Sequence, residues 1–336
     1  MTNINRRRFL AATPLVPAVL AAATTLRPLP GYAAGSPAEP LTRDGLPLFH
    51  RTRVGKIEVI ALLDGYATLP TSLITGLSEA EAAKAAKAAY KPHDPQMMSI
   101  AVNGYIIKTG KRVIAIDTGA PSAMAPTVGR WNAARQAAGI PAEEIDTVFL
   151  THLHGDHVGG LSDALSGGSS RLLPNAEFVC TQAEWDFTHD AAVYNALPEA
   201  FRGNFDAARA LVAPYTSDRK TIPMAETEIA PGVTAVPLPG HTPGHAGILV
   251  ESDGEQLLIW GDIVHAPGYQ FAHPEWSIVF DADPTLAQET RRAMLDRASA
   301  DRLMVAGMHL DFPALGYVER QAGAYRYIPA PMRYDL

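Results

Sequence analysis

Three histidines and one aspartate fall within six residues of the segment Thr151–Gly160, which has the sequence THLHGDHVGG. Imidazole and carboxylate groups are common ligands of divalent transition metals. His152 and His154 form one pair and Asp156 and His157 another, so one chain reversal can direct each pair at a different cation. The glycines of the segment permit the tight backbone of such a reversal. A surface loop with solvated imidazoles is the alternative, but this density of ligand-type residues favours a site for two metal ions.

This segment is expected to lie on the turn that follows a buried strand. Residues 147–150 are apolar and of types that favour strands, whereas Asp156 and His157 can open a helix. A loop that leaves a rigid strand is exposed at its tip but held from one side. The strand is therefore predicted to position the ligand-type side chains.

Other short apolar strands also end in ligand-type residues. The predicted strands 112–116, 233–237, 256–260 and 302–306 are followed by Asp117, His241, Asp262 and His309. One such residue can arise by chance, whereas the recurrence indicates that loops at one edge of a strand scaffold form a common site.

The remaining elements alternate between short strands and helices. We expect an arm at 36–52, strands at 56–63, 100–108 and 246–251, and helices at 78–90, 131–138 and 284–298. Asp64 and Gly65 are expected to turn the chain after its first strand. Ser78 and Glu81 are expected to form a capping box at the start of their helix.

Residues 1–34 resemble a twin-arginine signal peptide. Arg6–Arg8 precede the apolar stretch Ala11–Thr25, and small residues at Ala33–Gly35 offer a cleavage site. A membrane anchor is the alternative, but the apolar run is short and two prolines interrupt it. We therefore expect export by the twin-arginine machinery, no stable membrane anchor, and a soluble periplasmic or secreted domain over 35–336.

Charge and cysteine content narrow the function. Residues 1–34 carry four arginines and no acidic residue, so their removal changes the formal charge from −7 to −11. An acidic domain is poorly suited to nucleic acid, where phosphate neutralisation dominates affinity. Cys180 is the single cysteine, which excludes an internal disulfide, and its strand-like surroundings predict a small core side chain. The chain is long enough for one large domain or two modest ones.

The motif His-x-His-x-Asp-His, followed by a histidine, an aspartate and a last histidine, resembles the metallo-β-lactamase superfamily. The similarity uses five motifs, beginning with Asp117-Thr118-Gly119. The 21 residues from His241 to Asp262 and the 47 from Asp262 to His309 are similar to the spacing in methyl parathion hydrolase and its relatives, which include lactonases and arylesterases. The resemblance implies an α/β (α+β) fold, a four-layer αββα sandwich with the site at one edge, and a homodimer.

The resemblance also implies a division of the ligands. One metal would be held by His152, His154 and His241, the other by Asp156, His157 and His309, with Asp262 bridging them. Asp117 would be an acceptor that orients the histidine-bearing loop. His245 matches no ligand position and is interpreted as structural, whereas contact of His265 or His273 with substrate stays open.

Two such cations would lower the pKa of a bridging water and polarise a scissile carbonyl or phosphoryl oxygen. Asp262 would then accept the proton released in the attack and pass it to the leaving group. The ligand types favour zinc, although manganese, iron and cobalt use the same ligands.

The expected substrate is a small neutral molecule. Leu69, Leu73, Trp185 and Phe201 are predicted to line an apolar pocket, and the two aromatic residues could equally be ordinary core side chains. We expect hydrolysis of aryl esters or lactones, with phosphotriesters such as methyl parathion as further substrates.

Several other functions use the same fold. An exported β-lactamase, a thioester hydrolase of the glyoxalase II type and a non-catalytic binding protein remain alternatives. The thioester hydrolase would require a cationic C-terminal region, whereas only three arginines follow His309. A binding protein would have lost ligand positions, yet all seven are filled.

Overall fold

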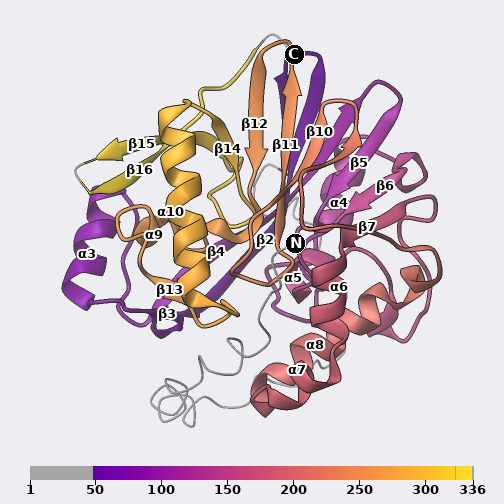
Figure 1. The fold of residues 1–336 in the computed structure, drawn as a ribbon, viewed down its shortest axis with the longest axis horizontal. Coiled ribbons are helices and arrows are strands. Elements are labelled where there is room, and N and C mark those ends of the chain that lie inside the picture. The colour runs from indigo at the N-terminus through magenta and orange to yellow at the C-terminus, as the bar shows by residue number, and fades with distance from the viewer. Residues whose placement is uncertain (1–47, 322, 335–336) are drawn as a thin grey trace.

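The computed structural model describes residues 48–321 and 323–334, so the predicted signal peptide and its cleavage site lie outside the described residues. Two seven-stranded sheets face each other, and helices cover their outer surfaces (Figure 1). This arrangement confirms the α/β class and the αββα sandwich.

The first sheet has the strand order β1-β2-β4-β5-β6-β7-β8. Its strands are β1 (Phe49–Val54), β2 (Ile57–Pro70), β4 (Met97–Thr109), β5 (Arg112–Ile116), β6 (Thr147–Phe149), β7 (Glu177–Thr181) and β8 (Lys220–Ile222). The pairs from β1 to β5 are antiparallel, and the pairs from β5 to β8 are parallel.

The second sheet has the order β16-β15-β14-β12-β11-β10-β9. Its strands are β9 (Thr227–Ala230), β10 (Val233–Pro237), β11 (Ala246–Ser252), β12 (Glu255–Ile259), β14 (Met304–Ala306), β15 (Leu315–Gln321) and β16 (Ala324–Pro329). Within it, only β12 and β14 pair in parallel. A separate two-stranded sheet joins β3 (Ile74–Thr75) to β13 (Ser277–Ile278).

The helices form the outer layers and the connections. They are α3 (Glu79–Ala88), α4 (Trp131–Ala137), α5 (Gly155–Val158), α6 (Gln182–His189), α7 (Ala191–Ala196), α8 (Glu199–Val212), α9 (Pro267–Gln270) and α10 (Pro284–Ala300). Side chains of α4, α6 and α8 pack on the outer face of the first sheet. α10 covers the second sheet, and α7 and α8 project at the bottom of the view (Figure 1).

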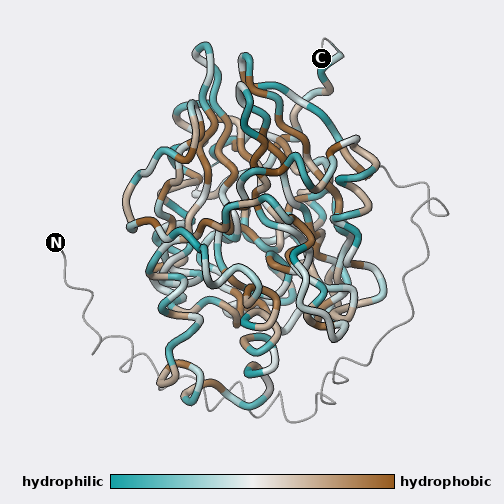
Figure 2. The backbone as a smooth tube through the Cα atoms, turned by 90° about the vertical axis from the view of Figure 1, so that its right-hand side faces the viewer, coloured by the Kyte–Doolittle hydropathy of each residue, from teal (hydrophilic) through white to brown (hydrophobic). Residues whose placement is uncertain are grey.

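Successive residues of β2 enter two different cores, because side chains alternate across a strand. Val59 and Ala61 lie between the sheets, whereas Ile60 and Leu62 lie under the helices of the first outer layer. Figure 2 shows the hydrophobic stretches concentrated in the strands at the centre of the molecule. Burial on both faces explains the unbroken apolar run in this strand. Cys180 is a buried member of the outer core, as predicted.

Several sequence predictions are wrong in detail. Asp64 and Gly65 do not turn the chain, because β2 continues through them with a register shift against β4. Residues 49–52, predicted as part of an arm, belong to β1. Ser78 occupies the N-cap of α3 but makes no capping side-chain hydrogen bond, so the capping box does not form. Across the described part of the chain, no helix combines the length and apolarity needed to span a bilayer.

Asp64 has an unexpected structural role at this irregularity. Its buried carboxylate accepts hydrogen bonds from the backbone N–H groups of Ala120, Gly129, Arg130 and Trp131, at 2.7–3.2 Å. These bonds join β2 to the loop before α4 and to the first turn of that helix. The Asp64 carboxylate therefore makes a long-range connection at the position where the sequence predicted a turn.

We predict that Asp64→Asn lowers the free energy of unfolding by about 2–4 kcal/mol, because an amide nitrogen would face backbone N–H donors. Urea denaturation of the metal-free protein measures this loss. Asp186→Asn, which alters an exposed carboxylate on α6, serves as the matched control. Equal stability of the two variants would contradict this role.

Candidate metal centre

The ligand-type residues gather where strands of both sheets end. β5 and β6 run parallel in the first sheet, and β10, β12 and β14 share one direction in the second. Their carboxyl ends therefore meet at the same edge of each sheet. The loops that leave these strands carry Asp117, the histidine motif, His241, Asp262 and His309.

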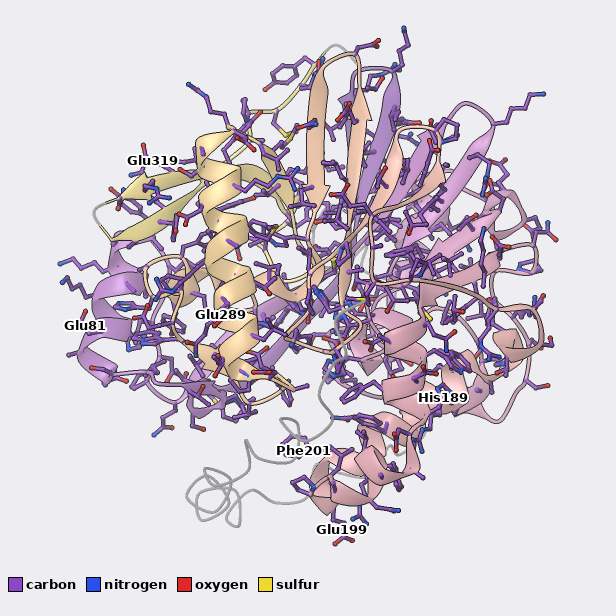
Figure 3. The ribbon with its side chains drawn as sticks, viewed as in Figure 1. Glu81, His189, Glu199, Phe201, Glu289 and Glu319 are labelled. Atoms are coloured by element: carbon purple, nitrogen blue, oxygen red, sulfur yellow. The ribbon has the colours of Figure 1, made fainter. Side chains whose placement is uncertain are left out.

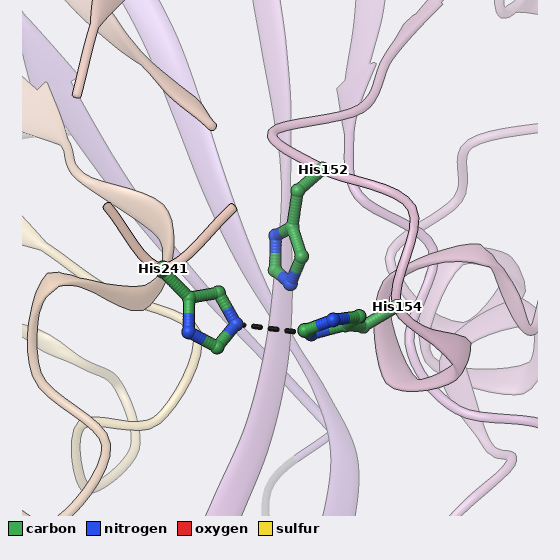
Figure 4. Close-up of side chains that lie close together, drawn as sticks. All are labelled: His152, His154 and His241. Atoms are coloured by element: carbon green, nitrogen blue, oxygen red, sulfur yellow. Dashed lines mark hydrogen bonds between the residues drawn. The ribbon is translucent and has the colours of Figure 1, made fainter. Parts of the chain in front are cut away.

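The first group consists of His152, His154 and His241, whose ligand atoms all lie within 4.8 Å of one another. His154 Nδ1 is 3.0 Å from His241 Nε2, although the two residues come from different sheets. Figure 4 shows the three rings converging from two separate loops. The structure thus brings together the three side chains that the resemblance assigns to one metal.

The second group consists of Asp156, His157 and His309, which meet the same distance criterion. Asp262 lies between the two groups. Its Oδ2 is 3.7 Å from His152 Nε2, 3.3 Å from His241 Nε2, 3.4 Å from His157 Nε2 and 3.2 Å from His309 Nε2. One carboxylate oxygen therefore faces imidazoles of both groups, as a bridging ligand requires.

Two buried aspartates, Asp117 and Asp281, each contact the Nδ1 atom of one histidine in the two groups. Asp117 accepts hydrogen bonds from the backbone N–H and the hydroxyl of Thr151, and its Oδ2 is 2.6 Å from His157 Nδ1. Asp117 has a positive φ of 53°, a strained conformation for this residue type. Asp281 Oδ1 lies 2.8 Å from His241 Nδ1. Such partners fix the ring orientation and the tautomer of a ligand histidine.

His309 is held by β4 of the opposite sheet. Its Nδ1 lies 2.8 Å from the backbone oxygen of Ala101. The buried amide of Asn103 donates to the backbone oxygens of Met308 and Leu310, both at 2.8 Å. The residues on either side of His309 are therefore tied directly to the first sheet.

The other three histidines near the motifs differ in position. His245 lies between the backbone oxygen of Leu238 and the backbone N–H of Asp262, at 2.7 and 2.9 Å, which gives it a structural contact. His265 is buried, with Nε2 at 3.1 Å from Asp262 Oδ2, and therefore belongs to the cluster. His273 stacks on Trp276 and contacts Glu275 instead.

Burial lowers the pKa values of His152 and His154 in the first group, whereas neighbouring carboxylates overcome burial and raise those of His157 and His309 in the second. Burial lowers the pKa of His152 well below its ordinary value and that of His154 to about 3. Burial opposes ionisation of Asp262, but nearby imidazoles, His157 first, hold its pKa well below the usual range. Burial would also lower the pKa of His157, yet Asp262 and Asp156 raise it well above its ordinary value. The two carboxylates therefore favour a positive charge at this position.

These residues fit divalent cations. His152 Nε2, His157 Nε2 and Asp262 Oδ1 are buried and have no hydrogen-bond partner among the described residues. Buried polar atoms without partners are rare, and a bound ion is one explanation for them. The lowered pKa values of His152, His154 and Asp262 also favour the neutral imidazole and the ionised carboxylate, the forms in which these groups bind metals.

The four residues predicted to line the substrate pocket lie in different parts of the structure. Trp185 packs against Phe178 in the outer core. It is therefore the ordinary core side chain that the sequence offered as the alternative, and not part of the metal-ligand cluster. Phe201 is half-buried on the α7–α8 projection (Figure 3), with its ring against Phe280 at a centroid distance of 6.1 Å. Phe280 precedes Asp281, the partner of His241. Leu69 and Leu73 pack against the same small apolar cluster as Phe280.

The sequence interpretation missed Asn103, Asp281 and Glu184, which all support ligand loops. Asn103 interrupts the apolar run of β4, and a lone amide in a buried strand was an available signal. No local pattern marks Asp281. Glu184 follows Thr181 by three residues, so its spacing predicts a helix cap instead.

We predict that Asp117→Asn weakens binding of one metal ion by about 10–100-fold, because an amide cannot accept all the hydrogen bonds from Thr151 and His157. Competition with a chromogenic chelator measures the dissociation constants. Asp163→Asn, in the loop after the histidine motif, is the control and should bind both ions as the unchanged protein does. Unaltered affinity in Asp117→Asn would show that Asp117 does not position a ligand.

The chain is similar in fold and sequence to several known proteins. AidC, described as a dizinc quorum-quenching lactonase in complex with a product, superposes with a TM-score of 0.77 at 25% identity, over 85% of this chain and 99% of AidC. AbOPH, a hydrolase in the beta lactamase superfamily, superposes with a TM-score of 0.79 at 28% identity, over 86% and 99%. N-acyl homoserine lactonase AiiB of Agrobacterium fabrum (strain C58) is 27% identical over 174 residues, which are 46% of this chain and 59% of AiiB.

The chain thus spans about three fifths of the length of the first curated relatives it matches. A family model described as the metallo-beta-lactamase superfamily matches residues 100–309, which contain every residue of the two groups and Asp262. The chain belongs to the metallo-beta-lactamase superfamily.

Proposed function

We propose that this protein is a metal-dependent hydrolase that uses two divalent cations, with small neutral lactones and esters as its substrates. One observation carries the proposal. A single oxygen of Asp262 lies within 3.7 Å of imidazoles from His152, His157, His241 and His309. A surface loop with solvated imidazoles would not bring side chains from both sheets to one carboxylate, whereas a site for two cations requires this arrangement.

The ligand assignment follows the two groups. His152, His154 and His241 would hold one ion, Asp156, His157 and His309 would hold the other, and Asp262 would contribute to both. Zinc is the expected metal, because imidazole-rich sites with a carboxylate favour it and AidC is a dizinc protein. Manganese, iron and cobalt are the alternatives on ligand type alone.

When bound, the two cations would supply a water of lowered pKa and would polarise the substrate carbonyl. The side chains of the protein perform the remaining tasks. The Asp262 carboxylate would accept the proton released during the attack and pass it to the leaving oxygen. His245 holds the backbone of Asp262, and Asp117 keeps the His157 ring in place.

Substrate approaches from the side of Asp156. Its side chain is 27% exposed, whereas those of His157, Asp262 and His309 are at most 3% exposed. Met124 lies beside Gly155, and its terminal methyl is 3.2 Å from the point that a Cβ on this glycine would occupy. We infer that Phe201, whose ring packs against that of Phe280, the residue before Asp281, adds apolar surface on the side of His241. These side chains suit an acyl chain or an aryl group better than an anion.

Two of the relatives agree with this substrate class. AidC is described as a lactonase in complex with its product, and AiiB is named an N-acyl homoserine lactonase. Phosphotriesters are a second proposed class, because they are also neutral and need an oxygen polarised by metal. β-Lactams and thioesters remain alternatives that the same site could attack.

Export completes the proposal. The arginine-led segment 1–34 acts as a twin-arginine signal, and residues 35–336 form the exported hydrolase, which functions in the periplasm or outside the cell. Folding before export would allow the metals to be loaded in the cytoplasm. A homodimer is proposed from the family resemblance.

We predict that the zinc-loaded protein hydrolyses N-acyl homoserine lactones or aryl esters faster than phosphotriesters, thioesters and β-lactams. Initial rates on one representative of each class measure this preference. Exhaustive chelation should abolish the activity, and added zinc should restore it, because the cations supply the nucleophile. Activity that survives chelation, or silence toward lactones and aryl esters, would contradict the proposal.

We predict that Asp262→Asn lowers kcat by at least about 100-fold, because an amide oxygen is a poor proton acceptor. Metal content is measured on the same samples to separate loss of a ligand from loss of proton transfer. Glu255→Gln, which neutralises an exposed carboxylate on β12, is the control. A variant that keeps both metals and full activity would exclude Asp262 as the proton acceptor.

A further inference from the structure

The first turn of α6 lies between the two loops that carry the first ligand group. One loop holds His152 and His154 after β6, and the other holds His241 after β10. The helix begins with Thr181 as its N-cap, whose hydroxyl accepts a hydrogen bond from the backbone N–H of Glu184. This helix contributes none of the proposed ligands.

The Glu184 carboxylate connects these two loops. Its Oε1 accepts a hydrogen bond of 2.9 Å from the backbone N–H of Leu153, the residue between His152 and His154. Its Oε2 accepts a hydrogen bond from the hydroxyl of Thr242, the residue after His241. One side chain therefore reaches the neighbours of all three histidines.

Close packing between the loop and the helix supports the same interpretation. A Cβ on Gly244 would lie 2.1 Å from the backbone nitrogen of Glu184, so only glycine allows this approach. The Thr181 hydroxyl also donates to the backbone oxygen of Gly244 at 2.7 Å. The loop that carries His241 is thus fixed to the start of α6 by shape and by hydrogen bonds.

Capping of α6 alone does not explain why the Glu184 side chain is buried. Thr181 and Glu184 have the spacing of a capping box, in which the acidic side chain would return to the N-cap. Here the carboxylate instead reaches the two loops, and Glu184 is only 1% exposed. A buried carboxylate is costly unless each oxygen has a partner, and these loops supply the partners.

We propose that Glu184 is a positioning residue that sets the separation of the two ligand loops, so that His152, His154 and His241 meet at one cation. The inference rests on the proposed metal site. It extends that site by a residue that touches neither metal nor substrate and acts only through the loop backbones. The second group, with Asp156, His157 and His309, receives no contact from Glu184.

The test is a titration of the purified full chain with cobalt(II), followed by visible absorption and by competition with a chelator. The unchanged protein should bind two ions. In Glu184→Gln and Glu184→Ala, one dissociation constant should rise about 10–100-fold while the other stays within about twofold. Thr242→Val should reproduce part of this loss, and the double variant Thr242→Val with Glu184→Gln should lose less than the sum.

Asp146→Asn is the matched control. Asp146 also accepts a backbone hydrogen bond, from Val113, and pairs with Arg112, but it lies before β6 rather than after it. Its variant should lose stability with both dissociation constants unchanged. Circular dichroism establishes folding of each variant, and Glu184→Gln decides the question if Glu184→Ala does not fold.

Two results would overturn the inference while leaving the metal site intact. Both ions could bind folded Glu184→Gln with unaltered affinity, or both affinities could fall in parallel. Absence of cobalt binding by the unchanged protein would instead refute the proposed function, and the inference with it. The two failures are therefore distinguishable in one set of titrations.

Discussion

A buried carboxylate surrounded by imidazoles is the constraint on which the site depends. Asp262 Oδ2 lies within 3.7 Å of ring nitrogens from both sheets, at the edge where the strands end. Ionised oxygen in such a position is stable only with compensating positive charge. In the protein alone, burial would lower the pKa of His157, but Asp262 and Asp156 raise it well above its ordinary value, which favours its charged form. Two cations would supply the compensating charge more completely and would engage the ring nitrogens that lack partners.

Polar contacts between residues that are far apart in the chain hold these loops in place. The Asp117, Asp281 and Asn103 side chains hold the loops or rings of His157, His241 and His309 respectively, and each is buried. Each partner therefore fixes geometry at a position where water cannot replace it. Because Asn103 of the first sheet holds the residues on either side of His309, which follows β14 of the second sheet, the relative placement of the two sheets affects whether the ligands meet.

The sequence predicted the parts of this site that depend on local pattern. The cluster at 152–157 and the strand before it are visible as residue types and spacing, and their placement followed from the alternation of apolar strands and ligand-type loops. The family resemblance supplied the pairing of His241 and His309 with this cluster.

Long-range contacts were not predictable from local sequence pattern. Asp64 and Gly65 have the composition of a turn, yet hydrogen bonds to a distant loop let the strand continue. Glu184 has the spacing of a cap, yet its partners lie 31 and 58 residues away.

The most direct measurement is an anomalous difference map at the zinc absorption edge, from crystals of the zinc-loaded protein. We expect two peaks, on either side of Asp262. One peak should lie among His152, His154 and His241, and the other among Asp156, His157 and His309. A single peak, or peaks outside these two groups, would contradict the claim that the strand ends converge to hold a pair of ions.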